Sequence, residues 1–102
     1  MDMSNLMKQA QQFQQNLKSL QDELAAKEVT GSAGAGMVSA TFNGQCDLIA
    51  LHMDPELVNQ ENTQMLQDLL MAAINDGLRK AKELAKGEMS RLTGGLNIPG
   101  LM

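Results

Sequence analysis

Aromatic residues are nearly absent from this chain of 102 residues, which has two phenylalanines, Phe13 and Phe42, and no tryptophan or tyrosine. Nine methionines supply much of the large apolar volume instead. Because methionine is flexible and fills irregular gaps, this composition indicates an adaptable core or interface rather than a methionine metal site. The length predicts one small domain, whose thin sheet has a single apolar face.

Residues suited to catalysis are equally scarce, since the chain has one cysteine, Cys46, and one histidine, His52. A lone thiol forms no internal disulfide, and the two residues do not make up a metal-ligand set. If both lie on one strand, their separation of six residues places them about 20 Å apart, too far to act as a pair. We therefore predict that the chain is not an enzyme and uses no cofactor, metal or small-molecule substrate.

Long apolar runs are also missing, because no stretch approaches the roughly 18 residues that a membrane span needs. The chain opens on a polar helical pattern rather than on a charged and then apolar signal sequence. Together with the single cysteine, this predicts a soluble protein of the reducing cytoplasm that has no membrane partner.

Positive charge is missing from the middle of the chain. Residues 28–76 contain seven acids and no lysine or arginine, whereas residues 1–27 are neutral overall and residues 77–102 sum to +3, for a net charge of −4. The net charge alone argues against nucleic-acid binding, but its distribution leaves a basic segment at the end of the chain.

The first part of the chain has a regular helical periodicity. Apolar residues alternate at spacings of three and four, at Met3, Leu6, Ala10, Phe13, Leu17, Leu20 and Leu24. This seam predicts an amphipathic helix over about residues 4–27, with Ser4 as its N-cap. Such a helix is about 36 Å long and a seven-residue strand about 23 Å, so the helix overhangs its sheet. We expect the uncovered part of the seam to pair with a second copy of the chain.

Three extended segments are predicted between about residues 28 and 53. The first ends at the glycines of residues 33–36, and Asn43-Gly44 predicts a two-residue type I′ turn between the next two. In that register Phe42 faces Gln45 and Val38 faces Ile49. One face then collects the apolar side chains and is expected to hold both long helices. Its members are Val38, Ala40, Phe42, Ile49, Leu51 and Met53.

A short turn over residues 54–58 is predicted from Asp54-Pro55, because aspartate caps helical turns and proline suits their first position. A second long helix follows over about residues 62–92, so that residues 1–92 form the domain and residues 93–102 a flexible tail. Gly34-x-Gly36 leads into a strand rather than a helix and lacks the Gly-Lys-Ser/Thr ending, which argues against a phosphate-binding loop.

Five basic residues gather in the second helix, at Arg79, Lys80, Lys82, Lys86 and Arg91. At 100° per residue, Arg79, Lys82 and Lys86 share an arc of about 60° on the face opposite the apolar stripe. Such a face can bind phosphates, with an affinity that falls steeply with salt. It can also be a solvated face on which Asp76 and Glu83 neutralise the cations. Composition and spacing leave both interpretations open.

Several segments resemble the YbaB/EbfC family of bacterial nucleoid-associated proteins. They are residues 5–12 (NLMKQAQQ), 28–36 (EVTGSAGAG), 42–44 (FNG), 54–57 (DPEL), 72–76 (AAIND) and 96–101 (LNIPGL). Together they cover nearly the whole chain.

The resemblance implies an α+β fold: an α-β-β-β-α protomer with a three-stranded antiparallel sheet, paired into a tweezer-like homodimer. It also implies a cytoplasmic, nucleoid-associated protein without enzymatic activity that binds double-stranded DNA with little sequence specificity. Such a protein helps organise the nucleoid or modulates gene expression. The DNA-binding residues that it implies are Lys8, Arg79, Lys80, Lys82, Lys86 and Arg91.

The third strand departs from the family pattern, because relatives often carry basic residues where this chain has Ile49 and Ala50. The alternative function is a dimeric helical scaffold or adaptor that binds a protein partner without touching DNA.

Overall fold

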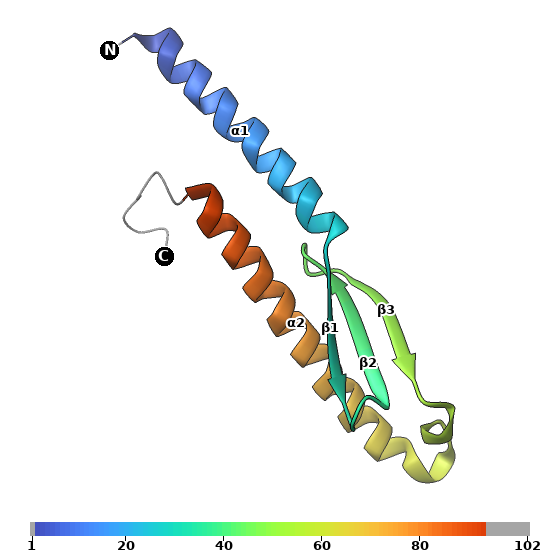
Figure 1. Ribbon diagram of the computed structural model, residues 1–102. Coiled ribbons are helices and arrows are strands. Elements are labelled where there is room, and N and C mark those ends of the chain that lie inside the picture. Colours follow the sequence, from blue (N-terminus) through green and yellow to red (C-terminus); the bar gives the residue numbers. More distant parts are fainter. Residues whose placement is uncertain (1, 94–102) are drawn as a thin grey trace.

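The computed structural model describes residues 2–93. The predicted tail lies outside the described residues, except for Thr93, which ends the last helix. The elements are α1 (Met3–Ala26), β1 (Glu28–Ala33), β2 (Val38–Asn43), β3 (Leu48–Met53), two short 3-10 turns (Pro55–Leu57 and Gln60–Asn62) and α2 (Thr63–Thr93). This order, with a three-stranded antiparallel sheet and two long helices, confirms the predicted fold class (Figure 1).

The first helix begins one residue earlier than its predicted cap. Asp2, and not Ser4, is the N-cap: its carboxylate accepts a hydrogen bond from the backbone N–H of Ser4 at 3.2 Å. Both residue types cap helices, and the chain uses the one that places Met3 in the first turn.

α1 does not lie on the sheet, which corrects the expectation that one apolar face holds both helices. Figure 1 shows α1 continuing away from the sheet, with α2 running back beside its C-terminal part. Leu20 and Leu24 are buried there, while Leu6 and Phe13 remain 46% and 37% exposed. Among the described residues the seam is therefore covered at its C-terminal end only, and α1 overhangs the sheet as predicted.

The return from β1 to β2 follows the glycines, as predicted. Gly34 and Gly36 have φ angles of 64° and 89°, and Ala35 between them has 56°. Glycine adopts such left-handed conformations without steric cost, and two of the three left-handed residues are glycines, so the chain reverses within one short loop. Ala33 then pairs with Val38 directly across the hairpin.

The predicted register between β2 and β3 is wrong. Val38 pairs with Met53 and Ala40 with Leu51, four residues from the predicted positions, and Ile49 is the extra residue of an irregularity that lets Phe42 pair with Leu48. A shift by an even number keeps side chains on their faces, so Val38, Ala40, Leu51 and Met53 still share one face.

A longer loop causes this shift. Asn43 and Gly44 do not have the positive φ angles of a type I′ turn, and the left-handed residue is Cys46, at φ 68°. The side-chain oxygen of Asn43 accepts hydrogen bonds from the backbone N–H groups of Gln45 and Asp47, at 2.9 and 3.1 Å. Asparagine thus closes the turn with its side chain.

Gly44 has a packing role instead of a turn role. Its N–H donates a hydrogen bond to the carbonyl of Leu24 at 2.7 Å, and a Cβ at this position would lie 2.6 Å from the same oxygen. The glycine lets the hairpin loop dock against the end of α1. The pair Asn43-Gly44 therefore fixes the position of the C-terminal end of α1 relative to the sheet.

The core lies between α2 and the first two strands. Val38 and Ala40 from β2 and Ala73 and Ala81 from α2 are fully buried. At Gly31 an added Cβ would overlap the backbone nitrogen of Gly77, so β1 and α2 approach backbone to backbone. The sheet residues Leu48, Ile49 and Leu51 of β3 are 47, 48 and 43% exposed, because α2 covers β1 and β2.

The molecule is extended. Its principal extents are 70 × 23 × 16 Å and its radius of gyration is 19.3 Å, whereas a compact chain of this length has about 13 Å. Neither helix in residues 2–93 has an apolar stretch sufficient to span a bilayer.

Candidate nucleic-acid interface

Three of the predicted cations line one shallow groove on the solvent side of α2. The groove has a volume of about 370 Å³ and is formed by Asn75, Leu78, Arg79, Lys82, Glu83 and Lys86. These positions recur at spacings of three and one, which is one face of a helix. The arrangement follows directly from helix geometry, because Gly77 and Ala81 turn the opposite face to the core.

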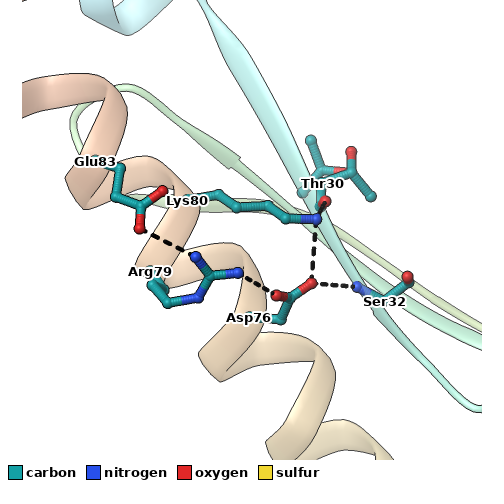
Figure 2. A network of polar contacts seen from close by, with 7 residues as sticks. Thr30, Ser32, Asp76, Arg79, Lys80 and Glu83 are labelled. Carbon is teal, nitrogen blue, oxygen red and sulfur yellow. Dashed lines mark hydrogen bonds and ion pairs between the residues drawn. The ribbon is translucent and has the colours of Figure 1, made fainter. Parts of the chain in front are cut away.

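Arg79 is held by two carboxylates. Its guanidinium donates hydrogen bonds to Asp76 at 2.9 Å and to Glu83 at 3.0 Å, as Figure 2 shows. These partners, Asp76 above all, raise the pKa of Arg79, so it stays charged. The side chain is nevertheless 58% exposed, and exposed ion pairs of this kind are weak, so a phosphate can compete for it.

Lys82 and Lys86 are the unpaired cations of the groove. Neither makes an ion pair or hydrogen bond with another residue in the described range 2–93, and both are exposed. The alternative pairing of Glu83 with Lys86 is therefore not formed, since Glu83 bonds Arg79. The interpretation in which acidic residues neutralise this face therefore holds for Arg79. It does not hold for Lys82 and Lys86, which have no acidic partner among the described residues.

Lys80 points away from the groove. Its ammonium donates a hydrogen bond to the carbonyl of Thr30 in β1 at 3.0 Å and lies 3.2 Å from Asp76. Asp76 also accepts a hydrogen bond from the backbone N–H of Ser32 at 3.2 Å (Figure 2). The pKa of Asp76 is lowered, first by Arg79 and then by the Ser32 N–H and Lys80.

Arg91 belongs to a second cluster, where α2 passes α1. Its guanidinium bonds Glu88 at 3.0 Å, and Glu88 also binds Lys27, the residue after α1, at 2.6 Å. Glu88 is only 8% exposed, and Lys27 is the main cause of its lowered pKa. A buried carboxylate needs such partners. The sequence contained one signal of this contact, because Glu88 occupies the apolar stripe of the helix.

Lys8 is remote from the other predicted cations. It lies in the projecting part of α1, eight residues and so about 12 Å along the axis from Asn16, where α1 meets the end of α2. The structure therefore brings together Arg79, Lys82 and Lys86, turns Lys80 and Arg91 to structural partners, and leaves Lys8 on a separate arm.

The side chains of the groove have the chemistry to bind phosphate groups. Its cations are exposed, and no group of three or more His, Cys, Asp and Glu side chains within residues 2–93 could hold a metal ion. Cys46 lies in the loop before β3 and His52 on β3, so they do not share a strand as predicted.

An elongated α-β-β-β-α protomer with exposed cations on one helix face is a small α+β protein whose surface can contact phosphate groups. The model of the YbaB/EbfC DNA-binding family matches residues 1–96. The chain belongs to the YbaB/EbfC family of nucleoid-associated DNA-binding proteins, and this membership confirms the predicted family and the prediction that the chain is not an enzyme.

Individual relatives cover almost the whole chain. A nucleoid-associated protein of Desulfotalea psychrophila is 50% identical over 101 residues, which span 99% of this chain and 95% of the relative. One from Clostridium acetobutylicum is 48% identical over 100 residues, 98% of this chain and 89% of the relative. The crystal structure of an uncharacterized Helicobacter pylori protein superposes with a TM-score of 0.84 at 31% identity, covering 92% of this chain and 99% of that one.

Proposed function

We propose that this protein binds double-stranded DNA as a homodimer, mainly through phosphate contacts and with little sequence specificity. The observation that carries the proposal is the groove of α2, where Arg79, Lys82 and Lys86 share one exposed face and two of them have no acidic partner among the described residues. Lysine and arginine bind phosphates without reading the bases. The acidic middle of the chain repels a duplex and limits contact to the basic helix faces.

The other cations of the predicted site have supporting roles in this proposal. Lys8 contacts phosphate from the projecting end of α1, while Lys80 and Arg91 add to the local positive potential and are partly engaged by Asp76 and Glu88.

Dimer formation is supported by apolar surface that the protomer leaves exposed. On α1, Met3, Leu6 and Met7 are 75, 46 and 62% exposed, and three residues of β3 are similarly open. A soluble protein rarely leaves such apolar surface exposed unless a partner covers it. A dimer also doubles the number of phosphate-binding grooves, which raises affinity for a long duplex.

The biological role follows the names of the relatives, which are nucleoid-associated proteins. We infer that this chain associates with the nucleoid in the cytoplasm and helps organise DNA or modulates gene expression. A fluorescent fusion that fails to follow the nucleoid in cells would contradict this role.

A salt titration of duplex binding tests the interaction itself. The affinity should fall steeply between about 50 and 200 mM salt and should be similar for duplexes of different sequence. Replacing Arg79, Lys82 and Lys86 together by glutamate should abolish binding. Absence of binding by the unaltered protein at low salt would refute the proposal and favour the protein scaffold instead.

A matched pair of variants tests the site. Lys86→Glu and Lys18→Glu change the net charge equally, but Lys18 lies on α1 outside the groove. Lys86→Glu should weaken binding and make its salt dependence shallower, by about one phosphate contact per groove. Equal effects of the two substitutions would show that only the net charge matters.

A further inference from the structure

The outer edge of β1 is occupied by side chains of α2. β1 pairs with β2 on one side, and its other edge faces no strand of the described residues 2–93. There the Thr30 carbonyl accepts a hydrogen bond from Lys80 at 3.0 Å, and the Ser32 N–H donates one to Asp76 at 3.2 Å. Alternate residues of an antiparallel edge strand turn their backbone groups outward, and Thr30 and Ser32 are two such residues. Figure 2 shows both contacts on the same side of β1.

The two side chains act as one unit. The Lys80 ammonium and the Asp76 carboxylate lie 3.2 Å apart, and the carboxylate oxygen that contacts Lys80 is the one that accepts from Ser32. One residue of an added parallel strand would make the same two contacts. Its N–H would donate to the Thr30 carbonyl, and its carbonyl would accept from the Ser32 N–H. Asp76 and Lys80, the edge cap, therefore occupy positions that a strand from another molecule needs.

The opposite edge of the sheet is different. No side chain within residues 2–93 is hydrogen-bonded to the backbone of β3, and its residues Leu48, Ile49 and Leu51 are about half exposed. An uncapped strand edge is a template for pairing with another chain. Only one of the two edges is thus closed by its own protomer.

We propose that the edge cap prevents β1 from pairing with a strand of a second copy, so that self-association stops at a closed dimer. A sheet that can be extended at both edges allows head-to-tail addition without end, whereas a sheet open at one edge does not. Lys80 then serves assembly through its hydrogen bond to Thr30, in addition to its part in the local positive potential. The proposal does not depend on DNA binding.

A third residue of α2, Arg79, stabilises the edge cap electrostatically. Arg79 holds the second oxygen of Asp76 at 2.9 Å, which leaves the first oxygen directed at Ser32 and Lys80. Arg79 thus orients the carboxylate toward β1. Loss of Asp76 and Lys80 together removes one negative and one positive charge, so the net charge of the chain stays constant.

The test is the mass of the Asp76→Ala/Lys80→Ala variant, measured by light scattering at increasing concentration without DNA. We expect the unaltered protein to keep one mass, and the variant to form heavier species that bind thioflavin T. A folded variant that keeps the mass of the unaltered protein at all concentrations would overturn the proposal. This comparison holds even if the unaltered protein is a monomer, a result that would count against the proposed dimer alone.

Two further variants separate edge pairing from misfolding. Glu83→Ala/Lys86→Ala also removes one charge of each sign from α2 but touches no strand, so it should keep the original mass. Adding Ser32→Pro to the Asp76→Ala/Lys80→Ala variant removes the outward N–H without breaking a bond to β2, so it should reverse the assembly. Assembly by the control, or assembly that proline does not reverse, would overturn the proposal.

A milder variant covers the case in which the double substitution unfolds the chain. Lys80→Met opens only the Thr30 carbonyl and leaves Asp76 bound to Ser32 and Arg79. Lys80→Met should assemble more slowly than the double variant. Adding Ser32→Pro to Lys80→Met should reduce its assembly further. A folded Lys80→Met variant that does not assemble would likewise count against the edge cap.

Discussion

Gly87 and Gly77 are both inside α2, but their surroundings differ. A Cβ at Gly87 would have no atom within 4 Å, whereas at Gly77 it would lie 2.7 Å from the ring of Phe42. Glycine weakens a helix, so Gly87→Ala should stabilise the protein by about 0.5–1 kcal/mol. Gly77→Ala should destabilise it by about 1–3 kcal/mol or more through overpacking. Urea unfolding followed by circular dichroism measures both, and a stable Gly77→Ala protein would contradict the close contact with Phe42.

Glu83 competes with DNA for Arg79 if the groove binds phosphate. Its carboxylate is 65% exposed and 3.0 Å from the guanidinium, so Glu83→Gln removes one of the two acidic partners of Arg79 without changing side-chain size. Affinity for a duplex should rise roughly two- to fivefold, which corresponds to an exposed ion pair of about 0.5–1 kcal/mol.

The matched control for Glu83→Gln is Glu61→Gln, which removes the same charge from the short turn before α2. Fluorescence anisotropy at one fixed salt concentration compares the two. A Glu61→Gln protein that gains as much affinity as Glu83→Gln would assign the effect to net charge and not to the groove.

Among the elements, the helices could be predicted well and the contacts between them poorly. The seam of α1 and the 60° arc of Arg79, Lys82 and Lys86 depend only on helix periodicity, so they survive in the structure. The hairpin register was wrong because a side chain, that of Asn43, closes the turn. Turn prediction from the residue pair Asn-Gly does not take these side-chain hydrogen bonds of Asn43 into account.

Contacts between distant parts of the chain could not be predicted from the sequence, in which the position of Glu88 in the apolar stripe was the one signal. Lys80 reaches a carbonyl 50 residues earlier, and Glu88 reaches Lys27 across 61 residues. Within its own helix each residue has an equally suitable partner, Asp76 for Lys80 and Arg91 for Glu88. Only the packing of α2 against β1 and α1 decides which additional partner is in reach.

The ion pair between Lys27 and Glu88 ties α1 to α2 and should make their association depend on pH. The pKa of Glu88 is lowered in the folded protein, chiefly by Lys27. A carboxyl with a lowered folded pKa stabilises the fold above its unfolded pKa, and this stability is lost as the pH falls through the folded value.

The midpoint of thermal unfolding should therefore fall on acidification below about pH 5. Glu88→Gln should unfold at a lower midpoint temperature at neutral pH, and its midpoint should depend less on pH under acidic conditions. Asp76→Asn removes a second lowered pKa and should flatten the profile further. Parallel profiles of Glu88→Gln and the unaltered protein would show that the tie between the helices does not titrate as described.

The whole molecule is a rod with a small core at one part of its length. Its fully buried apolar side chains come from β2 and the middle of α2, while no other element within residues 2–93 covers the outer half of α1. A helix of this length is stable in water mainly when its apolar side packs against something. The shape of the protomer is thus most easily understood as half of an assembly.

The seam of α1 should accordingly contribute to the proposed dimer. Leu6→Glu/Phe13→Glu places two charges on the exposed part of the seam, whereas Met65→Glu/Met71→Glu places the same charges on side chains of α2 that are 52 and 60% exposed. Burying an unpaired carboxylate in an interface is costly, so only the first variant should shift the mass from dimer to monomer. Its DNA binding should then lose about half of its salt dependence, because a monomer has one groove instead of two. If the α2 variant dissociated and the α1 variant stayed a dimer, the interface would lie on α2 and not on α1.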